Sequence, residues 1–395
     1  MASEPSASAL GVAEIEAAAR TVRGHVRETP MLAAREISER LGAPVRLKAE
    51  NLQRTGSFKT RGALNKVAGL SEAELARGLV AASAGNHAQA VAVAARSRDA
   101  AAQVVMPADA PVAKVEAVRG YGAEVRFVEG GYDDAASVAR ELAAEKGLTL
   151  VRAFDDLAVI AGQGTVGLEI AEQAPATATV VVPIGGGGLA AGVAIAVKAR
   201  LPGVRVVGVV SERRAAGTIC DGIAVKRPGT VTEPLLEAHV DAIVSVGDDE
   251  VAEAMVLLLE RSKLVVEGAG AASVAALLSG RTEPGGGEIC AVLSGGNVDA
   301  TRLTECIRMG ETAAGRRLVF STVLPDQPGA LARLLDEVAG AGANVLDVVH
   351  IREGVDLHVR ETGIRLVLQT DGRDHGQRVL AAVRTEGFAT EVHGG

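Results

Sequence analysis

The feature that most constrains the fold of this sequence is a regular alternation of short β-branched runs with longer alanine-rich stretches. From about Arg46 onward, most runs of strand length are followed by a segment of helical length, such as residues 86–97 and 188–200. Parallel strands need long crossover connections, so this order predicts an α/β fold with parallel sheet covered on both faces. The expected strands are VRLKAE, LVAAS, AQVVMP, EVRFV, TLVRAF, TVVVPIG, VRVVGVV and EICAVLSGG.

Three glycine-rich segments each follow an expected strand. SAGNH begins at Ser83, GGGGL at Gly185 and SGGN at Ser294. In open α/β sheets, ligands bind beyond the carboxyl ends of the strands, where loops and helix N-termini converge. The three turns are therefore expected on the same side of the sheets, and they are the candidates for a binding site.

The four consecutive glycines Gly185–Gly188 follow the strand VVVPI and precede a helical segment. Glycines let the backbone approach an anion, and the N-terminus of the helix favours negative charge, so a phosphate is the natural ligand. The spacing matches neither the GxGxxG dinucleotide fingerprint nor the P-loop, since no Lys-Ser or Lys-Thr pair follows the glycines. A tight structural turn is the alternative, and this motif alone does not separate the two.

Lys59 lies in the stretch NLQRTGSFKTRGALNK, between Gly56 and Gly62. A lysine held among apolar groups or at a helix N-terminus has a lowered pKa and offers a neutral amine as nucleophile and base. Taken alone, such a lysine is more often solvated. Together with a phosphate site it indicates an aldehyde cofactor that carries a phosphate, which is pyridoxal phosphate. A nucleotide site is the rival interpretation.

Two further motifs add donors to this site. SAGNHAQA, at residues 83–90, opens a helix with serine, asparagine and histidine in one turn, which offers N–H groups to a carboxylate. SGGN places the hydroxyl of Ser294 at the floor of the expected cleft. Each motif has an ordinary explanation when taken alone, as a helix N-cap and as a turn. The specific signal is the order Lys59, Asn86, Gly185–Gly188, Ser294.

The alternation of strands and helices ends after Met309. Residues 310–317, GETAAGRR, are small and polar and are expected to form a linker. The segments that follow predict a βαββαβ order, hence a four-stranded antiparallel sheet with two helices on one face, in a separate small domain. These segments are LVFSTVL, a helix over residues 331–341, NVLDVVHI, GIRLVLQT, a helix over residues 377–384 and a short strand near Thr390.

Composition excludes several classes of partner. The formal net charge is −8, aromatic residues make up 2% and tryptophan is absent, so the chain lacks the basic surface and the stacking side chains of nucleic-acid-binding proteins. The apolar run at residues 179–197 approaches membrane-spanning length, but its proline and glycines favour strand, turn and buried helix, so no membrane partner is expected. The N-terminal segment is unlike a signal peptide and the three cysteines are scattered, so a cytoplasmic location is expected.

In these motifs the chain resembles the fold-type II pyridoxal-phosphate enzymes, and within them the threonine dehydratases, or threonine ammonia-lyases. The segment DQPGAL resembles the ACT regulatory domain. The resemblance implies a catalytic domain over residues 1–314, with two open twisted sheets covered by helices, and a ferredoxin-like ACT domain over residues 315–395. The matching motifs span roughly residues 29–309 and are GSFKTRGA, SAGNHAQA, VIAGQGTVGLEI, PIGGGGLAAG, VEGAGAA and LSGGN.

The resemblance also implies a role for each matching residue. Lys59 is expected to form the covalent link to pyridoxal phosphate, Asn86 to hydrogen-bond the ring hydroxyl and Ser294 to face the pyridine nitrogen, with Lys59 and Ser294 as the catalytic residues. The remaining cofactor contacts are implied at Phe58, Gly185, Gly186, Gly187, Gly188 and Leu189, and contacts to the substrate carboxylate at Ser83, Gly85, Asn86 and His87.

The activity implied is deamination of L-threonine to 2-oxobutanoate and ammonia, with L-serine giving pyruvate. The related serine racemases carry a serine directly before the glycine of the Gly-Asn-His turn, as the acid and base on the opposite face of Cα. This chain has Ala84 there, which has no proton to give, so elimination is expected to dominate. Serine racemase/dehydratase and 3-hydroxyaspartate dehydratase are the alternatives, and a non-catalytic sensor of amino acid or cofactor is the alternative from another class.

Two further expectations concern metal binding and regulation. In relatives that bind a cation, the acid matching Glu212 begins the metal loop, but this chain is shorter between Glu212 and Cys220, which puts a metal there in doubt. Isoleucine or valine is the first effector expected at the C-terminal domain, and a dimerisation module without an effector is the alternative. A homodimer or homotetramer is expected, acting in threonine catabolism or isoleucine biosynthesis.

Overall fold

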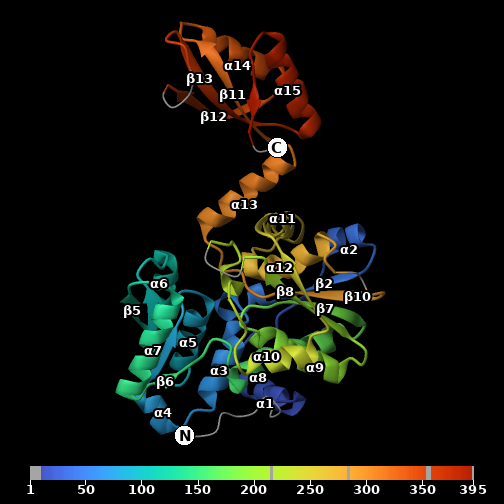
Figure 1. The fold of residues 1–395 in the computed structure, drawn as a ribbon. Coiled ribbons are helices and arrows are strands. Elements are labelled where there is room, and N and C mark those ends of the chain that lie inside the picture. The colour runs from blue at the N-terminus through green and yellow to red at the C-terminus, as the bar shows by residue number, and fades with distance from the viewer. Residues whose placement is uncertain (1–9, 214–216, 283–284, 353–356, 394–395) are drawn as a thin grey trace. The chain divides into compact units, whose positions relative to one another are not determined.

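The computed structural model describes residues 10–213, 217–282, 285–352 and 357–393. The chain divides into two compact units, Met1–Asp299 and Ala300–Gly395, and each has its own hydrophobic core. Two sheets, parallel but for one edge strand, make up the first unit, while the second is built on one antiparallel sheet (Figure 1).

The larger sheet of the first unit has the strand order β1-β2-β10-β7-β8-β9. Neighbouring strands are parallel except β1 and β2. The strands are β1 (Met31–Ala33), β2 (Val45–Ala49), β7 (Thr177–Pro183), β8 (Arg205–Ser211), β9 (Ala242–Val246) and β10 (Glu288–Leu293). On one side lies α12 (Gly268–Leu278), with α11 (Asp248–Leu257) and α2 (Arg35–Leu41) packed on it, and on the other lie α8 (Leu157–Gln173), α9 (Gly188–Arg200), α10 (Thr232–His239) and α1 (Val12–Val22) (Figure 1).

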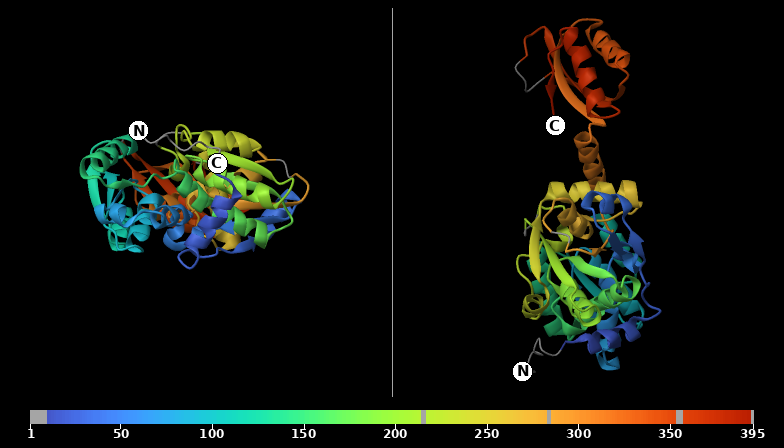
Figure 2. Two further views of the ribbon diagram at one scale, coloured as in Figure 1. Left: turned by 90° about the horizontal axis from the view of Figure 1, so that it is seen from below. Right: turned by 90° about the vertical axis from the view of Figure 1, so that its right-hand side faces the viewer.

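The smaller sheet has four parallel strands in the order β5-β4-β3-β6. Alternate side chains of a strand point to opposite faces. Leu79 and Ala81 therefore pack with one set of helices, while Val80 and Ala82 pack under another helix. The strands are β3 (Leu79–Ala82), β4 (Ala102–Pro107), β5 (Glu124–Val128) and β6 (Thr149–Leu150), with α3 (Lys59–Ala68), α4 (Glu72–Arg77), α5 (Asn86–Arg96) and α6 (Val112–Gly120) on the first face and α7 (Tyr132–Lys146) on the second. The two sheets lie side by side in Figure 1 and in the left-hand view of Figure 2.

The strand prediction for this unit is confirmed for all eight β-branched runs, and the helices expected at residues 86–97 and 188–200 occur as α5 and α9. Two strands were not predicted, β1 and β9. Both lie at the edges of the larger sheet. β1 is only three residues long and β9 is mostly half-buried or exposed, so both carry a weak burial pattern, whereas the edge strands β5 and β6 of the smaller sheet were predicted.

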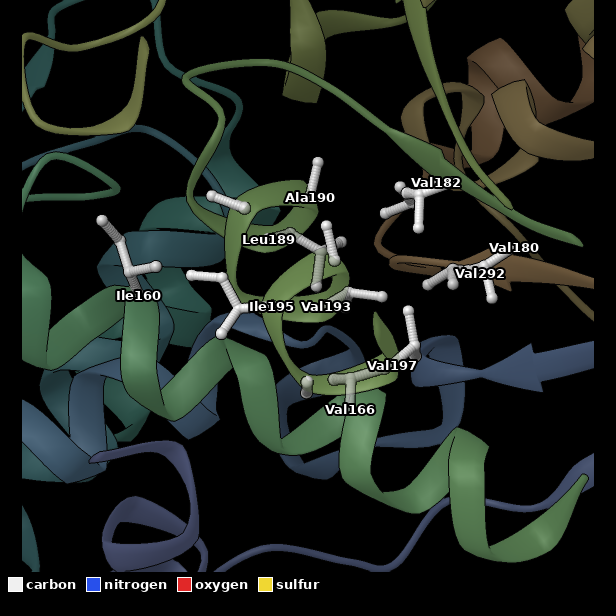
Figure 3. Packing of buried hydrophobic residues seen from close by; sticks show 14 of the residues in the cluster. Ile160, Val166, Val180, Val182, Leu189, Ala190, Val193, Ile195, Val197 and Val292 are labelled. Carbon is white, nitrogen blue, oxygen red and sulfur yellow. The ribbon is translucent and has the colours of Figure 1, made fainter. Parts of the chain in front are cut away.

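Glycines let α3, α8 and α9 pack at very short distances. A Cβ atom on Gly162 of α8 would lie 2.6 Å from the Cα of Gly62 in α3, and one on Gly164 would lie 2.9 Å from the carbonyl oxygen of Gly192 in α9. A glycine in a helix costs about 1 kcal/mol relative to alanine, and here the close packing offsets that cost. Figure 3 shows the apolar residues around α9, including Ile160 of α8. The motif VIAGQGTVGLEI thus fixes α3, which begins at Lys59.

The second unit has the predicted βαββαβ order, with a four-stranded antiparallel sheet in the order β12-β13-β11-β14. Phe320 and Leu366 from the sheet pack with Leu334 and Val379 from the two helices, so both helices cover the same face. The elements are β11 (Arg317–Pro325), α14 (Ala330–Gly340), β12 (Asn344–Ile351), β13 (Glu361–Gln369), α15 (Arg373–Thr385) and β14 (Glu391–Val392).

The linker predicted over residues 310–317 is wrong in most of its length. Helix α13 (Ala300–Ala313) runs through its first half, and a short turn leads directly into β11. The small polar composition suggested a flexible connection, but Gly310 lies inside the helix without ending it, and the break comes only at the second glycine, Gly315, with φ 70°. The division into domains at residues 314 and 315 stays a prediction.

Within the described residues, no helix is both long and apolar enough to span a membrane. The apolar run at residues 179–197 folds as the end of β7, a glycine turn and α9, as predicted.

Candidate active site

Lys59 is the first residue of α3 and follows a turn in which Thr55 (φ 64°) and Gly56 (φ 73°) have left-handed backbone. Its side chain is partly buried. The Nζ atom donates to the carbonyl oxygen of Ala153 at 2.8 Å and lies 5.1 Å from the centroid of the Phe58 ring. The amine is thus held against protein atoms.

The surroundings of Lys59 change its protonation. Burial lowers the pKa of Lys59 to about 8, and the charge of Glu267 opposes that change. Lysine in water has a pKa of about 10.4. A far larger fraction of this amine is therefore neutral at physiological pH, and a neutral amine can act as nucleophile and as base.

Strand β10 brings Ser294 next to the lysine segment. Ser294 is 3% exposed, and its Oγ lies 3.4 Å from the carbonyl oxygen of Ala269. The carbonyl oxygen of Ser294 accepts the backbone N–H of Phe58 at 3.1 Å. Two of the predicted site residues, Lys59 and Ser294, are therefore on adjoining segments.

Asn86 begins α5 and joins the same cluster through both ends of its amide. Its Nδ2 donates to Oε1 of Glu267 at 2.7 Å, and its Oδ1 accepts from Nδ2 of Asn297 at 2.7 Å. Asn297 is the last residue of the SGGN turn that begins at Ser294. The structure thus connects the predicted Asn86 position to the Ser294 turn.

The other side chains of the Ser-Ala-Gly-Asn-His turn are engaged within the protein. The hydroxyl of Ser83 accepts the backbone N–H of Gly85 at 3.1 Å. His87 is buried, with Nε2 at 2.9 Å from the carbonyl oxygen of Val151, and burial together with the charge of Lys59 lowers the pKa of His87 to about 3. The imidazole is neutral at physiological pH, so this turn offers a ligand the backbone N–H groups of a helix N-terminus.

The glycine loop joins β7 to α9, and its backbone is closely packed. Gly187 has φ 96° and caps α9. A Cβ atom on Gly186 would lie 2.1 Å from the ring of Phe154, and the carbonyl oxygen of Gly186 accepts from Oγ1 of Thr232 at 2.7 Å. Leu189, in the first turn of α9, is 5% exposed. The loop leads directly into the N-terminus of α9, whose first backbone N–H groups have no partner within the helix, and its role as a phosphate site stays a prediction.

Residues that follow β6 connect the glycine loop to the lysine. Phe154, which packs on Gly186, is the next residue after Ala153, whose carbonyl oxygen holds Lys59. The site therefore draws on segments at the carboxyl ends of β3, β6, β7 and β10. This is the place where the topology of open α/β sheets predicts a ligand.

Three residues of the site were missed from sequence, namely Phe154, Glu267 and Asn297. Glu267 and Asn297 belong to the motifs VEGAGAA and SGGN, but the sequence pattern predicts no role for either residue. Burial raises the pKa of Glu267 to about 7, and the charge of Asp221 acts in the same direction. The signal that could have indicated Glu267 is an isolated acid inside an apolar, glycine-rich stretch.

A buried ion-pair network lies behind the site. Arg61, two residues after Lys59, is fully buried and pairs with Glu50 at 2.8 Å and with Glu169 at 2.6 Å. Lys48, also fully buried, pairs with Glu169 at 2.5 Å. Although burial raises the pKa of Glu50, the charge and hydrogen bonds of Arg61 outweigh it and hold that pKa below its usual value. The network ties α3 to β2 and α8.

Glu212 lies at the surface. Its carboxylate is 3.4 Å from Arg281, which also pairs with Glu250 at 3.2 Å. Within the described ranges, no group of three or more His, Cys, Asp or Glu side chains is arranged to hold a metal ion. Part of the short loop that follows Glu212, residues 214–216, lies outside the described residues.

The donor set fits a phosphate-bearing aldehyde cofactor. Lys59 supplies an amine with a lowered pKa, and the glycine loop leaves no room for side chains at Gly186. The amide of Asn86 uses one of its two N–H groups on Glu267, which leaves the other for a ring oxygen.

The family model described as pyridoxal-phosphate dependent enzyme matches residues 22–295. The chain belongs to this family, its cofactor is pyridoxal phosphate, and the parallel sheets of its first unit are those of fold type II. It is 42% identical over 394 residues to an L-threonine ammonia-lyase of Geobacter sulfurreducens, with 96% of this chain and 98% of the relative covered.

Two solved structures resemble the first unit about equally well. One is maize serine racemase, with a TM-score of 0.71, 34% identity, and 75% of this chain and 96% of that chain covered. The other is the processed form of threonine deaminase isoform 2 from Solanum lycopersicum, with a TM-score of 0.70, 34% identity, and 75% and 91% covered. Fold similarity alone therefore does not separate elimination from racemisation.

Proposed function

We propose that this protein deaminates L-threonine to 2-oxobutanoate and ammonia, and converts L-serine to pyruvate by the same route. The observation that carries the proposal is Lys59, an amine with a lowered pKa held where the glycine loop, the Asn86 turn and the Ser294 turn meet. The similarity to an L-threonine ammonia-lyase over nearly the whole chain supports this choice of substrate.

The geometry of the site supports the roles that the sequence predicts for its residues, and we propose the same roles here. When bound, pyridoxal phosphate supplies an acceptor for the electron pair left on the substrate Cα. Lys59 holds the cofactor through its amine, the N–H groups of Gly185–Gly188 and Leu189 bind its phosphate, and Phe58 packs beside Lys59. Asn86 donates to the ring hydroxyl and Ser294 faces the ring nitrogen.

The chain's own groups then move the proton and orient the substrate. The turn from Ser83 to His87 binds the substrate carboxylate at the N-terminus of α5 through the backbone N–H groups that it does not use internally. The N–H of Ser83 donates to the carbonyl oxygen of Val105, and that of Gly85 donates to the Ser83 hydroxyl. With the cofactor bound, the neutral amine of Lys59 would remove the Cα proton of the substrate. The β-hydroxyl would leave as water with the proton that Lys59 has removed, and the enamine that results would tautomerise and hydrolyse, taking up one water, to the 2-oxo acid and ammonia.

Serine racemisation is the second candidate, because a solved serine racemase is similar in fold. Racemisation needs a proton donor on the face of Cα opposite Lys59. Ala84, the residue before Gly85, offers none, and the buried imidazole of His87 is neutral and bonded to a backbone carbonyl. We therefore expect pyruvate and ammonia as the main products from L-serine.

For the C-terminal unit we propose an ACT-type regulatory domain that binds isoleucine or valine, over residues 315–395. Support comes from its βαββαβ order and from the DQPGAL turn, where Gly329 has φ 88° and caps α14. Because this turn resembles those of ACT domains, we also propose that the protein forms a homodimer or homotetramer. A role in threonine catabolism or isoleucine biosynthesis, in the cytoplasm, belongs to the same proposal.

The test of the reaction type is a product analysis with L-serine. The holoenzyme is incubated with L-serine, and pyruvate, ammonia and D-serine are quantified together. We expect equimolar pyruvate and ammonia with little D-serine. D-serine as the main product would favour the racemase, and absorption of bound cofactor without any product from serine, threonine or 3-hydroxyaspartate would favour a sensor.

A further inference from the structure

Glu267 is a buried carboxyl group in the candidate active site. The proposed reaction assigns no role to it. It is 6% exposed and precedes α12. Its backbone N–H donates to the carbonyl oxygen of Gly295 at 3.1 Å. A Cβ atom on Gly295 would lie 2.3 Å from its Oε1, so only glycine at that position leaves room for the carboxyl group. The backbone is thus shaped around this acid.

A backbone carbonyl that Asn86 does not contact determines which atoms donate in the hydrogen bonds around Asn86. Asn297 places its Nδ2 at 2.6 Å from the carbonyl oxygen of Thr55, and a carbonyl oxygen can only accept. The same Nδ2 lies 2.7 Å from Oδ1 of Asn86. This leaves the Nδ2 of Asn86 to donate to Glu267. A backbone carbonyl therefore fixes the orientation of the Asn86 amide through Asn297.

Charged groups from several elements face Glu267. Lys59 is on α3, and Asp221 begins the short helical turn Asp221–Ile223. The thiol of Cys220, just before that turn, is neutral because burial raises its pKa to about 12. Lys114 of α6 partly offsets Asp221, with which it pairs at 3.1 Å. Burial and Asp221 raise the pKa of Glu267 to about 7, against the hydrogen bonds from Asn86 and from the backbone of Asn297. Glu267 can therefore gain or lose a proton in the neutral range.

We propose that Glu267 is a positioning residue that couples its own ionisation, through the amide of Asn86, to the ring oxygen of the bound cofactor. The inference rests on the proposed contact between Asn86 and that oxygen. An ionised Glu267 accepts from one N–H of Asn86 and so holds the other N–H toward the cofactor. A protonated Glu267 accepts more weakly and removes a negative charge from the neighbourhood of the ring.

The experiment follows the visible absorption of the holoenzyme without substrate from about pH 5.5 to pH 9. We expect an absorption step with a midpoint in the neutral range for the natural protein and its loss in Glu267→Gln. The amide of glutamine keeps the size of the side chain but does not titrate. The control is Glu237→Gln on the exposed side of α10, which leaves the step in place. An unchanged step in Glu267→Gln, or no step in the natural protein, overturns the proposal.

A second variant tests the same coupling without a substitution in the buried part of the site. Asp221 has an exposed side chain and favours protonation of Glu267. Asp221→Asn should therefore move the midpoint of the absorption step to lower pH, and a midpoint that stays in place or rises overturns the proposal. These readouts do not use turnover. Failure of the threonine reaction and failure of this coupling are therefore distinguishable, since a holoenzyme without turnover still reports the step.

Discussion

At the scale of single residues, the decisive balance is between the burial of Lys59 and the charge of Glu267. Burial disfavours the ammonium form of Lys59, whereas the carboxylate of Glu267 favours it. Burial has the larger effect, so the pKa of Lys59 falls to about 8. The hydrogen bond to the carbonyl oxygen of Ala153 holds the amine in place. A residue that must attack an aldehyde at neutral pH needs this balance.

The first prediction concerns the pH dependence of cofactor binding by the cofactor-free protein. Only the neutral amine attacks the aldehyde, so the rate of appearance of the cofactor's visible absorption should rise about tenfold per pH unit below pH 8 and level off above it. An ordinary lysine would give a rate that rises until about pH 10.4.

Stopped-flow mixing with pyridoxal phosphate at a series of pH values provides the measurement. Lys59→Ala should show no such absorption, while Lys66→Ala, seven residues along the same helix and paired with the partly buried Asp156 at 2.7 Å, serves as the matched control. A rate that climbs without a plateau beyond pH 9 would contradict the lowered pKa.

How far the site could be predicted also depends on the individual residue. Lys59, Asn86, Ser294 and the glycine loop carry local signals, because each lies in a glycine-rich segment that follows a strand or precedes a helix. Phe154, Glu267 and Asn297 act through side chains that reach another segment. Local patterns say which residues are apolar or acidic but not which of them meet across the cleft.

At the scale of secondary-structure elements, the glycine loop depends on a close approach that any side chain would prevent. We predict that Gly186→Ala costs about 1–3 kcal/mol of stability through overpacking against Phe154, and that it weakens binding of pyridoxal phosphate by at least about tenfold. Thermal denaturation and a cofactor titration measure the two effects.

The matched control for the glycine loop is Gly120→Ala. Gly120 ends α6, and a Cβ atom there meets nothing within 4 Å. This variant should bind the cofactor like the natural protein. Equal cofactor affinity in Gly186→Ala and Gly120→Ala would show that the packing of the loop does not determine phosphate binding.

A second prediction at this scale concerns the buried ion pairs that hold α3, the helix that begins at Lys59. Arg61→Met leaves Glu50 buried without its main partner, and it should destabilise the protein by about 3–5 kcal/mol. The cofactor should also bind less tightly, since Arg61 anchors α3 to β2 and α8.

Chemical denaturation monitors the effect of Arg61→Met. Arg35→Met, which removes an exposed ion pair with Glu39, should leave the unfolding midpoint unchanged. A loss of stability in Arg61→Met no larger than in Arg35→Met would mean that the buried network does not hold α3.

Most helices and strands of the first unit could be predicted from the sequence, but two strands and one helix could not. The buried strands and α5 and α9 were predicted because burial on both faces leaves continuous apolar runs. The strands β1 and β9 and the helix α13 were not, because β1 has only three residues, β9 is mostly half-buried or exposed and α13 buries little of its surface. The edge strands β5 and β6 of the smaller sheet were predicted from their β-branched runs. The glycines of α8 were recognised as part of a motif, while their reason, contact with α3 and α9, is visible only in the structure.

At the scale of the whole molecule, the chain combines a pyridoxal-phosphate unit with a small antiparallel unit. On the proposed ACT function, isoleucine or valine should change the rate of threonine turnover by the full-length protein. Gly329→Ala, which places a side chain at φ 88° in the effector turn, should raise the effector concentration needed for half of the response.

The control for the effector experiment is Gly340→Ala at the end of α14, where a Cβ atom meets nothing within 4 Å. It should respond like the natural protein. Turnover that is indifferent to both amino acids up to saturation would favour a dimerisation module without an effector.

The most direct test of the central claim is the formation of 2-oxobutanoate and ammonia from L-threonine by the purified holoenzyme, compared with its Lys59→Ala and Lys66→Ala variants. We predict equimolar products from the natural protein and from Lys66→Ala, and neither turnover nor cofactor absorption from Lys59→Ala. Substantial turnover by Lys59→Ala, or absorption of bound cofactor in the natural protein without any 2-oxo acid, would contradict the account.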